Sequence, residues 1–518
     1  MRRFVIFVHR YLGIPMSIVF VVWFVSGIVM MYAGGMPRLT SAERLARVPA
    51  LDLSRITVSP AEAAAAAGLS GSPGRTSVGS ILGRPAYRFE PFPGAQVTVF
   101  ADSAEILGLV GPEQALSAAA AFLGEPEQSL RFVQTLTSAD QWTLTQGRNL
   151  PLHQFRVDDD QETTVYVSET SGQVALTTTR RTRMLAWLGT IPHWFYFSAL
   201  RSNQPLWYRT VVWVSALGCL MAILGLALAV LQFKRSRPFS LKASIRYRGW
   251  ARWHYISGAV FGVFALTWVF SGMLSMEPFR WTRVEEALFP GDVLAGSPVD
   301  LGNYPELDAS RWQHVAGAGA LKELEYLRIM GDPYFLVRVA NDAKNTDLPR
   351  ERLHQPYGVA LNSGRGEFLV DARTLDVREA PFPTELLIAK LQGGLGAQIE
   401  RYDLLHDYDG YYYSQSGQAA LPILRVKFDD PLATWMYIDP AMATIVAQVH
   451  RYSRLERWLF NGLHSLDFGF WYDKRPLWDV GMILLSIGAL ATSAIGMFLG
   501  FRRLAAFSRR RELRNGSA

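Results

Sequence analysis

The sequence predicts an integral membrane protein in which a four-helix transmembrane bundle, built from two parallel tandem repeats, carries two large α+β domains. Four apolar stretches are long enough to cross a bilayer, helical and β-type patterns alternate between them, and the second half of the chain repeats the first. With 49% hydrophobic and 19% charged residues over 518 positions, the chain has too much charge to lie in a membrane throughout.

Each of the four apolar stretches has about 20 residues or more, which as a helix crosses a hydrocarbon core of about 30 Å. The first follows Met1, Arg2 and Arg3 but is too long for a cleaved signal peptide, so we interpret it as a retained anchor. The transmembrane helices are predicted at 4–32, 208–233, 254–276 and 478–501.

Basic residues predict the orientation. The loop 234–253 has seven lysines and arginines and no acidic residue, and the tail 502–518 has six arginines against Glu512. Such segments stay on the cytoplasmic side. We therefore expect a multi-pass protein of the bacterial inner membrane, in contact with its lipid, with both termini cytoplasmic.

The remaining segments, 33–206 and 277–476, are then expected in the periplasm. Ala-rich stretches such as 60–68 and 112–124 have helical patterns, whereas 85–92, 163–169, 366–372 and 424–430 have strand patterns. Each segment is predicted to be an α+β domain, with helices packed on antiparallel sheets.

Charge and cysteine content exclude several functions. The net charge of +7 comes from the cytoplasmic segments, and the rest of the chain has more acidic than basic residues, so no nucleic-acid partner is expected. The single cysteine, Cys219, excludes internal disulfides, covalently attached haem and thiolate iron–sulfur clusters.

The internal repeat is the most informative feature. Residues 150–207 match 421–478 at a constant offset of 271, and the first and third apolar stretches match at an offset of 245. Because an even number of spans separates the copies, they have the same orientation and are related by a pseudo-twofold axis along the membrane normal. Equivalent residues are therefore expected to meet near that axis.

Four of the nine histidines fall in matched pairs: His9 with His254, and His193 with His464. His9 and His254 lie near the cytoplasmic ends of spans one and three, whereas His193 and His464 lie just outside the outer ends of spans two and four. A single histidine there is commonly a polar anchor. Two matched pairs instead predict two metal centres, one near each face of the membrane.

Small residues flank these histidines. Gly13 and Gly258 each stand four residues after their histidine and share its helix face, which predicts a groove for a flat ligand, although ordinary small-residue packing is an alternative. Facing imidazoles beside glycines suit a b-type haem with histidine at both axial positions. Zinc would need more ligands than two histidines. We predict two bis-histidine haems b, with Gly13 and Gly258 among the cofactor contacts.

With these residues in view, the chain resembles the PepSY-associated transmembrane family, and within it the di-haem ferric-siderophore reductases of the inner membrane, of the ferrioxamine reductase type. The resemblance covers most of the chain and is strongest in the spans. It rests on HRYLG at 9–13, WFVSG at 23–27, WVFSG at 268–272, VSPAEAAAAAG at 58–68 and LHSLDF…RPLW at 463–478. His193 departs from the pattern, since PHWFYF replaces LHSLDF.

The resemblance implies PepSY-like periplasmic domains and an oxidoreductase that reduces a ferric siderophore or other ferric chelate. No catalytic residue is predicted. The aromatic and acidic run at 402–413 suits a ferric chelate but is also common in exposed sheets. The cytoplasmic loop is too short for a nucleotide domain, so a separate electron donor is expected, either quinol or a cytoplasmic reductase. The alternative is a haem-free PepSY module that regulates a periplasmic peptidase or assembly partner.

Overall fold

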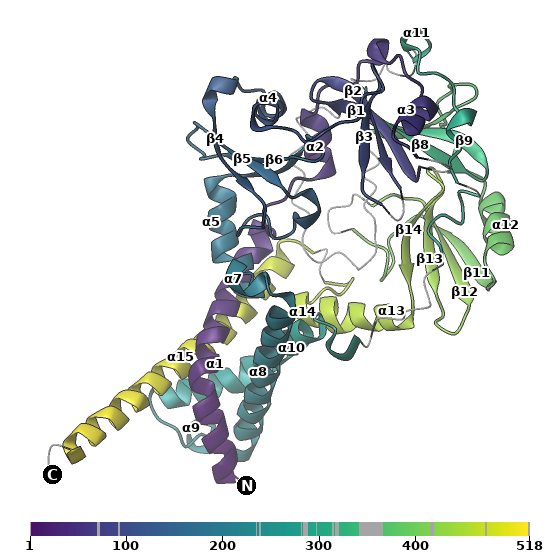
Figure 1. The fold of residues 1–518 in the computed structure, drawn as a ribbon. Coiled ribbons are helices and arrows are strands. Elements are labelled where there is room, and N and C mark those ends of the chain that lie inside the picture. Colours follow the sequence, from purple (N-terminus) through teal and green to yellow (C-terminus); the bar gives the residue numbers. More distant parts are fainter. Residues whose placement is uncertain are drawn as a thin grey trace.

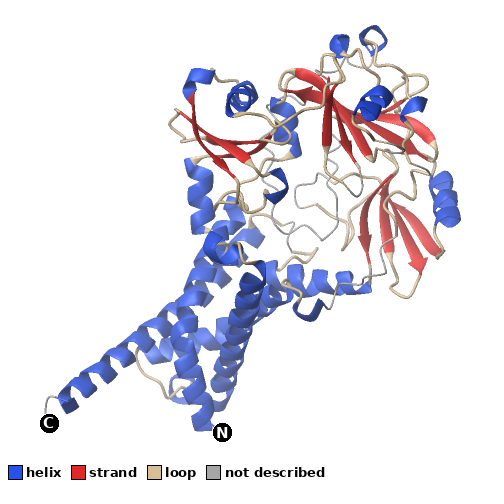
Figure 2. Ribbon diagram, viewed as in Figure 1, coloured by secondary structure: helices blue, strands red, loops and turns tan. Residues whose placement is uncertain are grey.

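A bundle of long helices occupies one end of the protein and β-sheets occupy the other (Figure 1, Figure 2). The N-terminus, the end of α15 and the short helix α9 (Leu241–Ser244) lie away from the sheets. The computed structural model describes the chain apart from residues 1, 70–72, 92–93, 235, 238–239, 281, 283–288, 297, 313–314, 316–320, 341–365, 415–418, 472–473 and 516–518.

Four helices form the bundle: α1 (Arg2–Ala33), α8 (Gln204–Gln232), α10 (Trp250–Leu274) and α15 (Leu477–Asn515). Each is long and apolar enough to span a membrane, which confirms the prediction of four candidate membrane helices. α1 packs against α8 and α15, and α10 packs against the same two helices. The tail predicted at 502–518 continues α15 through Asn515, because the helical hydrogen bonds persist beyond the apolar residues.

Two of the three sheets each belong to one half of the chain. In the first half, β4 (Leu130–Leu136), β5 (Leu152–Val157), β6 (Thr164–Ser168) and β7 (Val174–Thr178) form an antiparallel sheet under α4 (Pro112–Leu123). In the second half, the equivalent sheet under α12 (Thr384–Gly394) consists of β11 (Gln398–Leu405), β12 (Ile423–Asp429), β13 (Trp435–Asp439) and β14 (Thr444–Val449).

The third sheet joins the two halves, which the sequence patterns did not predict. Strand β1 pairs antiparallel with β8, placing Thr76 opposite Tyr326 and Gly79 opposite Glu323. Each half contributes three strands, so the order is symmetric about this pair. The strands in order are β10 (Glu367–Asp371), β9 (Asp332–Val339), β8 (Leu321–Ile329), β1 (Arg75–Ile81), β2 (Arg84–Glu90) and β3 (Val97–Phe100).

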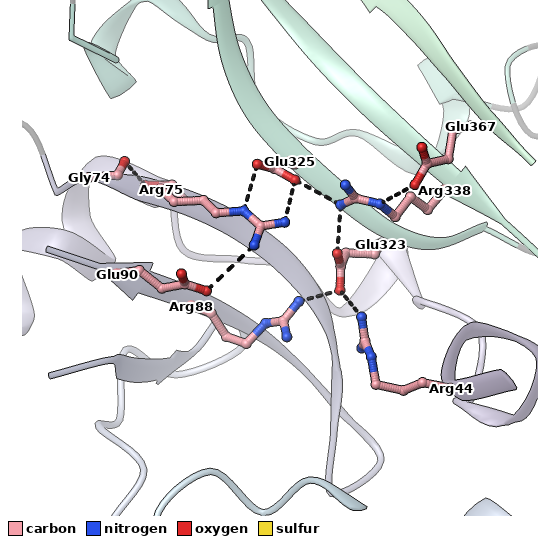
Figure 3. A network of polar contacts seen from close by, with 10 residues as sticks. Arg44, Gly74, Arg75, Arg88, Glu90, Glu323, Glu325, Arg338 and Glu367 are labelled. Atoms are coloured by element: carbon pink, nitrogen blue, oxygen red, sulfur yellow. Dashed lines mark hydrogen bonds and ion pairs between the residues drawn. The ribbon is translucent and has the colours of Figure 1, made fainter. Parts of the chain in front are cut away.

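An ion network lies across the junction of the two halves (Figure 3). Glu323 on β8 pairs with Arg88 on β2, and with Arg338 on β9 at 2.8 Å. Glu325, also on β8, pairs with Arg75 on β1 at 2.7 Å and with Arg338 at 2.8 Å. The glutamates come from the second half and Arg75 and Arg88 from the first, so the network ties the two halves of the chain together.

The pKa of Glu323 shows how strongly the arginines act. Burial alone would raise it, but the charges of Arg88, Arg44 and Arg338 outweigh burial and lower the pKa from 4.5 to about 2. Arg44 reaches Glu323 from α2 (Ser41–Arg47) at 3.5 Å. Because the folded-state pKa is depressed, this stabilisation is complete above about pH 4.5 and is lost as the pH falls toward 2.

We therefore expect Glu323→Gln to lower the free energy of unfolding at pH 7 by about 3–5 kcal/mol, because three arginines lose a buried partner. The variant should also lose less stability than the wild type between pH 4.5 and pH 2. Unfolding in detergent at several pH values measures both effects. Glu90→Gln is the control, since Glu90 is 44% exposed and 4.0 Å from Arg75. An unchanged acid response in Glu323→Gln would contradict this role of the network.

Candidate functional site

The structure brings His9 on α1 and His254 on α10 together, with ring centres 6.4 Å apart and ring planes 34° apart. Nδ1 of His9 lies 3.2 Å from the carbonyl oxygen of Met221 on α8, and Nδ1 of His254 lies 3.1 Å from that of Thr492 on α15. A carbonyl oxygen only accepts hydrogen bonds, so each Nδ1 has the proton. The unprotonated nitrogen of both rings is therefore Nε2, which in a neutral imidazole is able to bind a metal.

His193 and His464 form a second pair at the sheet end of the bundle. His193 lies on α6 (Thr190–Trp194) and His464 on α14 (Leu463–Ser465), and their ring centres are 6.2 Å apart with planes 81° apart. Nδ1 of each ring lies 3.0 Å from a serine hydroxyl, Ser26 for His193 and Ser271 for His464. Both serines come from the neighbouring long helix, α1 or α10.

Those serines also determine the tautomer of the outer pair. The hydroxyl of Ser26 donates to the carbonyl oxygen of Trp23, and that of Ser271 donates to Trp268. With its only proton used, each serine oxygen accepts from the histidine Nδ1–H. Burial lowers the pKa of His464 to about 4, so this imidazole is neutral at physiological pH.

The ring separations allow one ion to be shared within each pair. Two imidazoles that each hold an ion at about 2 Å have ring centres about 6 Å apart. Among the residues that the structure describes, no three or more His, Cys, Asp and Glu side chains form a group that could hold a metal ion. If a pair held a six-coordinate ion, it would supply two protein ligands, and a bound group would have to fill the other positions. The ligand role of the four histidines itself stays a prediction.

Glycines face both pairs closely. A Cβ atom at Gly225 would lie 2.9 Å from Cε1 of His9, and one at Gly496 would lie 3.0 Å from Cε1 of His254, closer than Cβ atoms ordinarily approach. At Gly27 and Gly272 the corresponding distances to His193 and His464 are 3.5 and 3.6 Å. The inner pair therefore requires glycine on α8 and α15.

Gly13 and Gly258 face the helix turns that hold the inner histidines. A Cβ at Gly13 would lie 3.9 Å from Sδ of Met221, and one at Gly258 would lie 3.6 Å from Cγ2 of Thr492. These are ordinary contact distances, so the protein leaves room at both positions. Their contact with a cofactor remains a prediction.

Two buried indole N–H groups lie near the outer pair. Nε1 of Trp23 and Nε1 of Trp268 are buried and have no hydrogen-bond partner among the described residues. The two tryptophans stand three residues before Ser26 and Ser271. Because a buried donor without an acceptor is costly, the pair of indoles suits a bound group that has polar atoms.

A buried ion pair supports the loop that holds His464. Arg457 pairs with Asp467 at 3.3 Å, and Tyr413 donates a 2.6 Å hydrogen bond to Asp467, whose side chain is fully buried. Burial, together with the Asp467 charge, raises the pKa of Tyr413. At an offset of 271 the first half has Ala186 and Tyr196 in place of the ion pair. The surroundings of the outer pair are thus asymmetric, as the PHWFYF sequence indicated.

The other histidines are accounted for differently. His153 is buried in the sheet and bonds the carbonyl oxygen of Val110 at 2.7 Å, His450 caps α13 (Arg451–Arg457), and His406 is exposed. The five unmatched histidines suggest surface or domain-packing roles from the sequence, and two of them, His314 and His354, lie outside the described residues.

Sequence reasoning missed the groups that hold the inner imidazoles. The carbonyl oxygens of Met221 and Thr492 have no sequence signature, but these residues are 271 apart, as are Gly225 and Gly496. The glycines belong to a stripe of small residues on spans two and four, a pattern that is typical of ordinary helix packing. The offset of 271 between Gly225 and Gly496 was the signal in the sequence that could have identified these two glycines.

Four membrane-length apolar helices joined to sheet-rich regions define a multi-pass membrane protein with α+β domains. The family model described as the PepSY-associated TM region matches residues 7–503, so the chain belongs to that family. No curated protein matches the sequence.

Proposed function

We propose that the protein is a haem-dependent oxidoreductase of the bacterial inner membrane, which passes electrons across the bilayer and reduces a ferric siderophore or other ferric chelate in the periplasm. The observation that carries the proposal is the pair of imidazoles at each end of the bundle, with ring centres 6.4 and 6.2 Å apart and Nδ1 held by a hydrogen-bond acceptor. His9 and His254 would be the axial ligands of one haem b, and His193 and His464 those of the other.

The residues present fit such a group. Haem fills four positions of a six-coordinate iron and leaves two for the protein, which is the number that each pair offers. The buried indoles of Trp23 and Trp268 have donors to offer to polar atoms of a ligand. When bound, haem supplies a centre that accepts and releases one electron at a time.

The chain's own residues would perform three tasks. The acceptors on α8 and α15, and the serines on α1 and α10, keep each Nδ1 protonated, which orients the ring and leaves Nε2 as the nitrogen that would hold the iron. Between the two pairs, Phe20, Phe24, Trp268 and Met482 pack in one apolar cluster that excludes water. Glycines on α8 and α15 leave the inner imidazoles the space in which they lie.

The spacing along α1 suits transfer across a bilayer. Ser26, which contacts His193, stands 17 residues after His9, or about 26 Å at a helical rise of about 1.5 Å per residue. A hydrocarbon core is about 30 Å thick. One pair would therefore lie near each face of the membrane.

We further infer that the chain arose by duplication of a unit of span, outer domain and span. Equivalent contacts support this, since Met221 and Thr492, which accept from the inner histidines, differ by the offset of 271 found in the sequence. Ser26 and Ser271, which accept from the outer histidines, differ by 245. The basic loop and tail favour cytoplasmic termini and sheets in the periplasm.

The substrate is proposed from chemistry. Hard oxygen ligands hold ferric iron strongly, and one added electron weakens that hold, so reduction releases the metal. The electron would come from a separate donor, quinol or a cytoplasmic reductase, which is oxidised as the iron is reduced.

The proposed function is tested in sealed vesicles with a reductant trapped inside, and with a ferric chelate and a membrane-impermeant ferrous indicator outside. Vesicles with the wild-type protein should form ferrous iron outside, and vesicles with His9→Ala should form it no faster than protein-free vesicles. His406→Ala, which changes an exposed histidine outside the pairs, is the control and should retain the wild-type rate. Equal rates for the wild type and His9→Ala would refute trans-bilayer transfer through this site.

Substitution of one glycine should remove one haem. Gly225→Ala places a methyl group 2.9 Å from Cε1 of His9, so the ring has to move and the inner iron loses a ligand. We expect the haem content per chain of the Gly225→Ala variant to fall by about half relative to the wild type. Gly27→Ala is the control, because its methyl group meets His193 at an ordinary 3.5 Å. The measurement is a haem assay of the purified variants. Full haem content in Gly225→Ala would show that haem binding does not depend on the close approach of position 225 to His9.

A further inference from the structure

Three cations surround one indole ring on the second-half sheet. Lys427 on β12 lies directly opposite Trp435 on β13, with Nζ 3.9 Å from the centre of the indole. The guanidinium carbon of Arg454 on α13 lies 4.5 Å from that centre, and that of Arg425 lies 5.4 Å away. The ring of Tyr411 meets the indole edge-on at 5.3 Å. We call these five residues the Trp435 cluster.

Two of the three cations in the cluster have no carboxylate close enough for an ion pair among the described residues, and Asp403, Glu400 and Asp430 act on them only from farther away. Arg425 is paired with Asp403 at 3.0 Å and Asp409 at 2.7 Å. Among described residues, no carboxylate lies within ion-pair distance of Lys427 or Arg454. Arg454 instead donates to backbone carbonyl oxygens at 2.7 and 3.1 Å. Burial and the charge of Arg425 lower the pKa of Lys427, so the fold holds this one cation at a cost.

The first half has no such cluster. At an offset of 271, Thr164 stands in place of Trp435 and Gln154 in place of Arg425. Arg183, the counterpart of Arg454, is paired with Glu162 at 3.2 Å. Because the folds of the two sheets are equivalent, packing alone does not require the cluster. It is a feature of the second half only.

The cluster is connected to the outer histidine pair. Tyr411 lines a small hollow of about 20 Å³ that also includes Arg457 and Phe460. The ring of Phe460 lies 5.2 Å from that of His464. In Figure 1, α13, which carries Arg454, runs from the edge of this sheet toward α14, which carries His464. A molecule bound at the cluster would thus lie near the hollow beside the outer pair.

We propose that the Trp435 cluster is the binding site for a negatively charged ferric chelate. The identity of the ligand as an iron chelate rests on the proposed function, whereas the sign of its charge rests on the cluster itself. An anion would pair with Lys427 and Arg454, the two cations without a carboxylate at ion-pair distance among the described residues, and the indole and phenol rings offer apolar faces to the organic part of the chelate. The local positive potential would also attract such anions from solution.

Binding is measured on the oxidised, full-length protein in detergent, so that no electron transfer is involved. The probe is anionic ferric tricatecholate labelled with radioactive iron, in equilibrium dialysis. Lys427→Gln should weaken binding by about tenfold, and the double variant with Arg454→Gln should weaken it further, because each change removes one charge-assisted contact. Lys427 makes no hydrogen bond that the described fold needs, so its variant should unfold as the wild type does.

Arg156→Gln is the matched control, since Arg156 occupies the position of Lys427 in the first half. It should bind the tricatecholate as the wild type does. Unchanged binding in both Lys427→Gln and the double variant would overturn the proposal, and so would equal affinity for a cationic ferric hydroxamate. If Lys427→Gln and the double variant lost binding to anionic phosphatidylglycerol vesicles but still bound the tricatecholate, the cluster would be a lipid contact. This outcome would also overturn the proposal.

The two proposals fail separately. A wild-type protein without haem that still binds the tricatecholate through Lys427 would refute the proposed function and leave the anion site standing. A haem-containing protein that binds the tricatecholate equally well with and without Lys427 and Arg454 would refute the anion site and leave the proposed function standing.

Discussion

Both proposed haem sites depend on one interaction, the hydrogen bond made by Nδ1 of each of the four histidines. A neutral imidazole that donates a hydrogen bond from Nδ1–H has its free lone pair on Nε2. The ring cannot rotate without losing that hydrogen bond. Carbonyl oxygens of α8 and α15 provide the acceptors for the inner pair, and serine hydroxyls of α1 and α10 provide them for the outer pair. The bundle must keep four helices in register for all of these contacts to form together.

Much of the membrane part could be predicted from the sequence. Hydropathy located the four helices to within a few residues except at the end of α15, and the offsets of 245 and 271 selected the histidines that lie together. The acceptors for the inner pair could not be predicted, because every residue type has a backbone carbonyl oxygen. The need for Gly225 was also hidden, since a glycine in an apolar helix more often marks helix packing than a ligand contact.

Outside the bundle, the sequence predicted the kinds of elements but not how the halves join. Alternation located several of the strands, yet periodicity does not determine which edge strands pair, so the β1–β8 junction was missed. Glu323 and Arg88 are far apart in the chain, and nothing in either sequence context indicates their ion pair. The network makes the two halves one unit above the membrane, whereas the Arg457–Asp467 pair and the Trp435 cluster distinguish the second half.

The most direct measurement is a dithionite-reduced minus oxidised spectrum of detergent-purified protein, with haem counted per chain. The account predicts b-type bands from two haems in the wild type, loss of one haem in His9→Ala and loss of the other in His464→Ala. A wild-type protein without haem bands, or variants that each retain both haems, would contradict the claim that each histidine pair holds one iron.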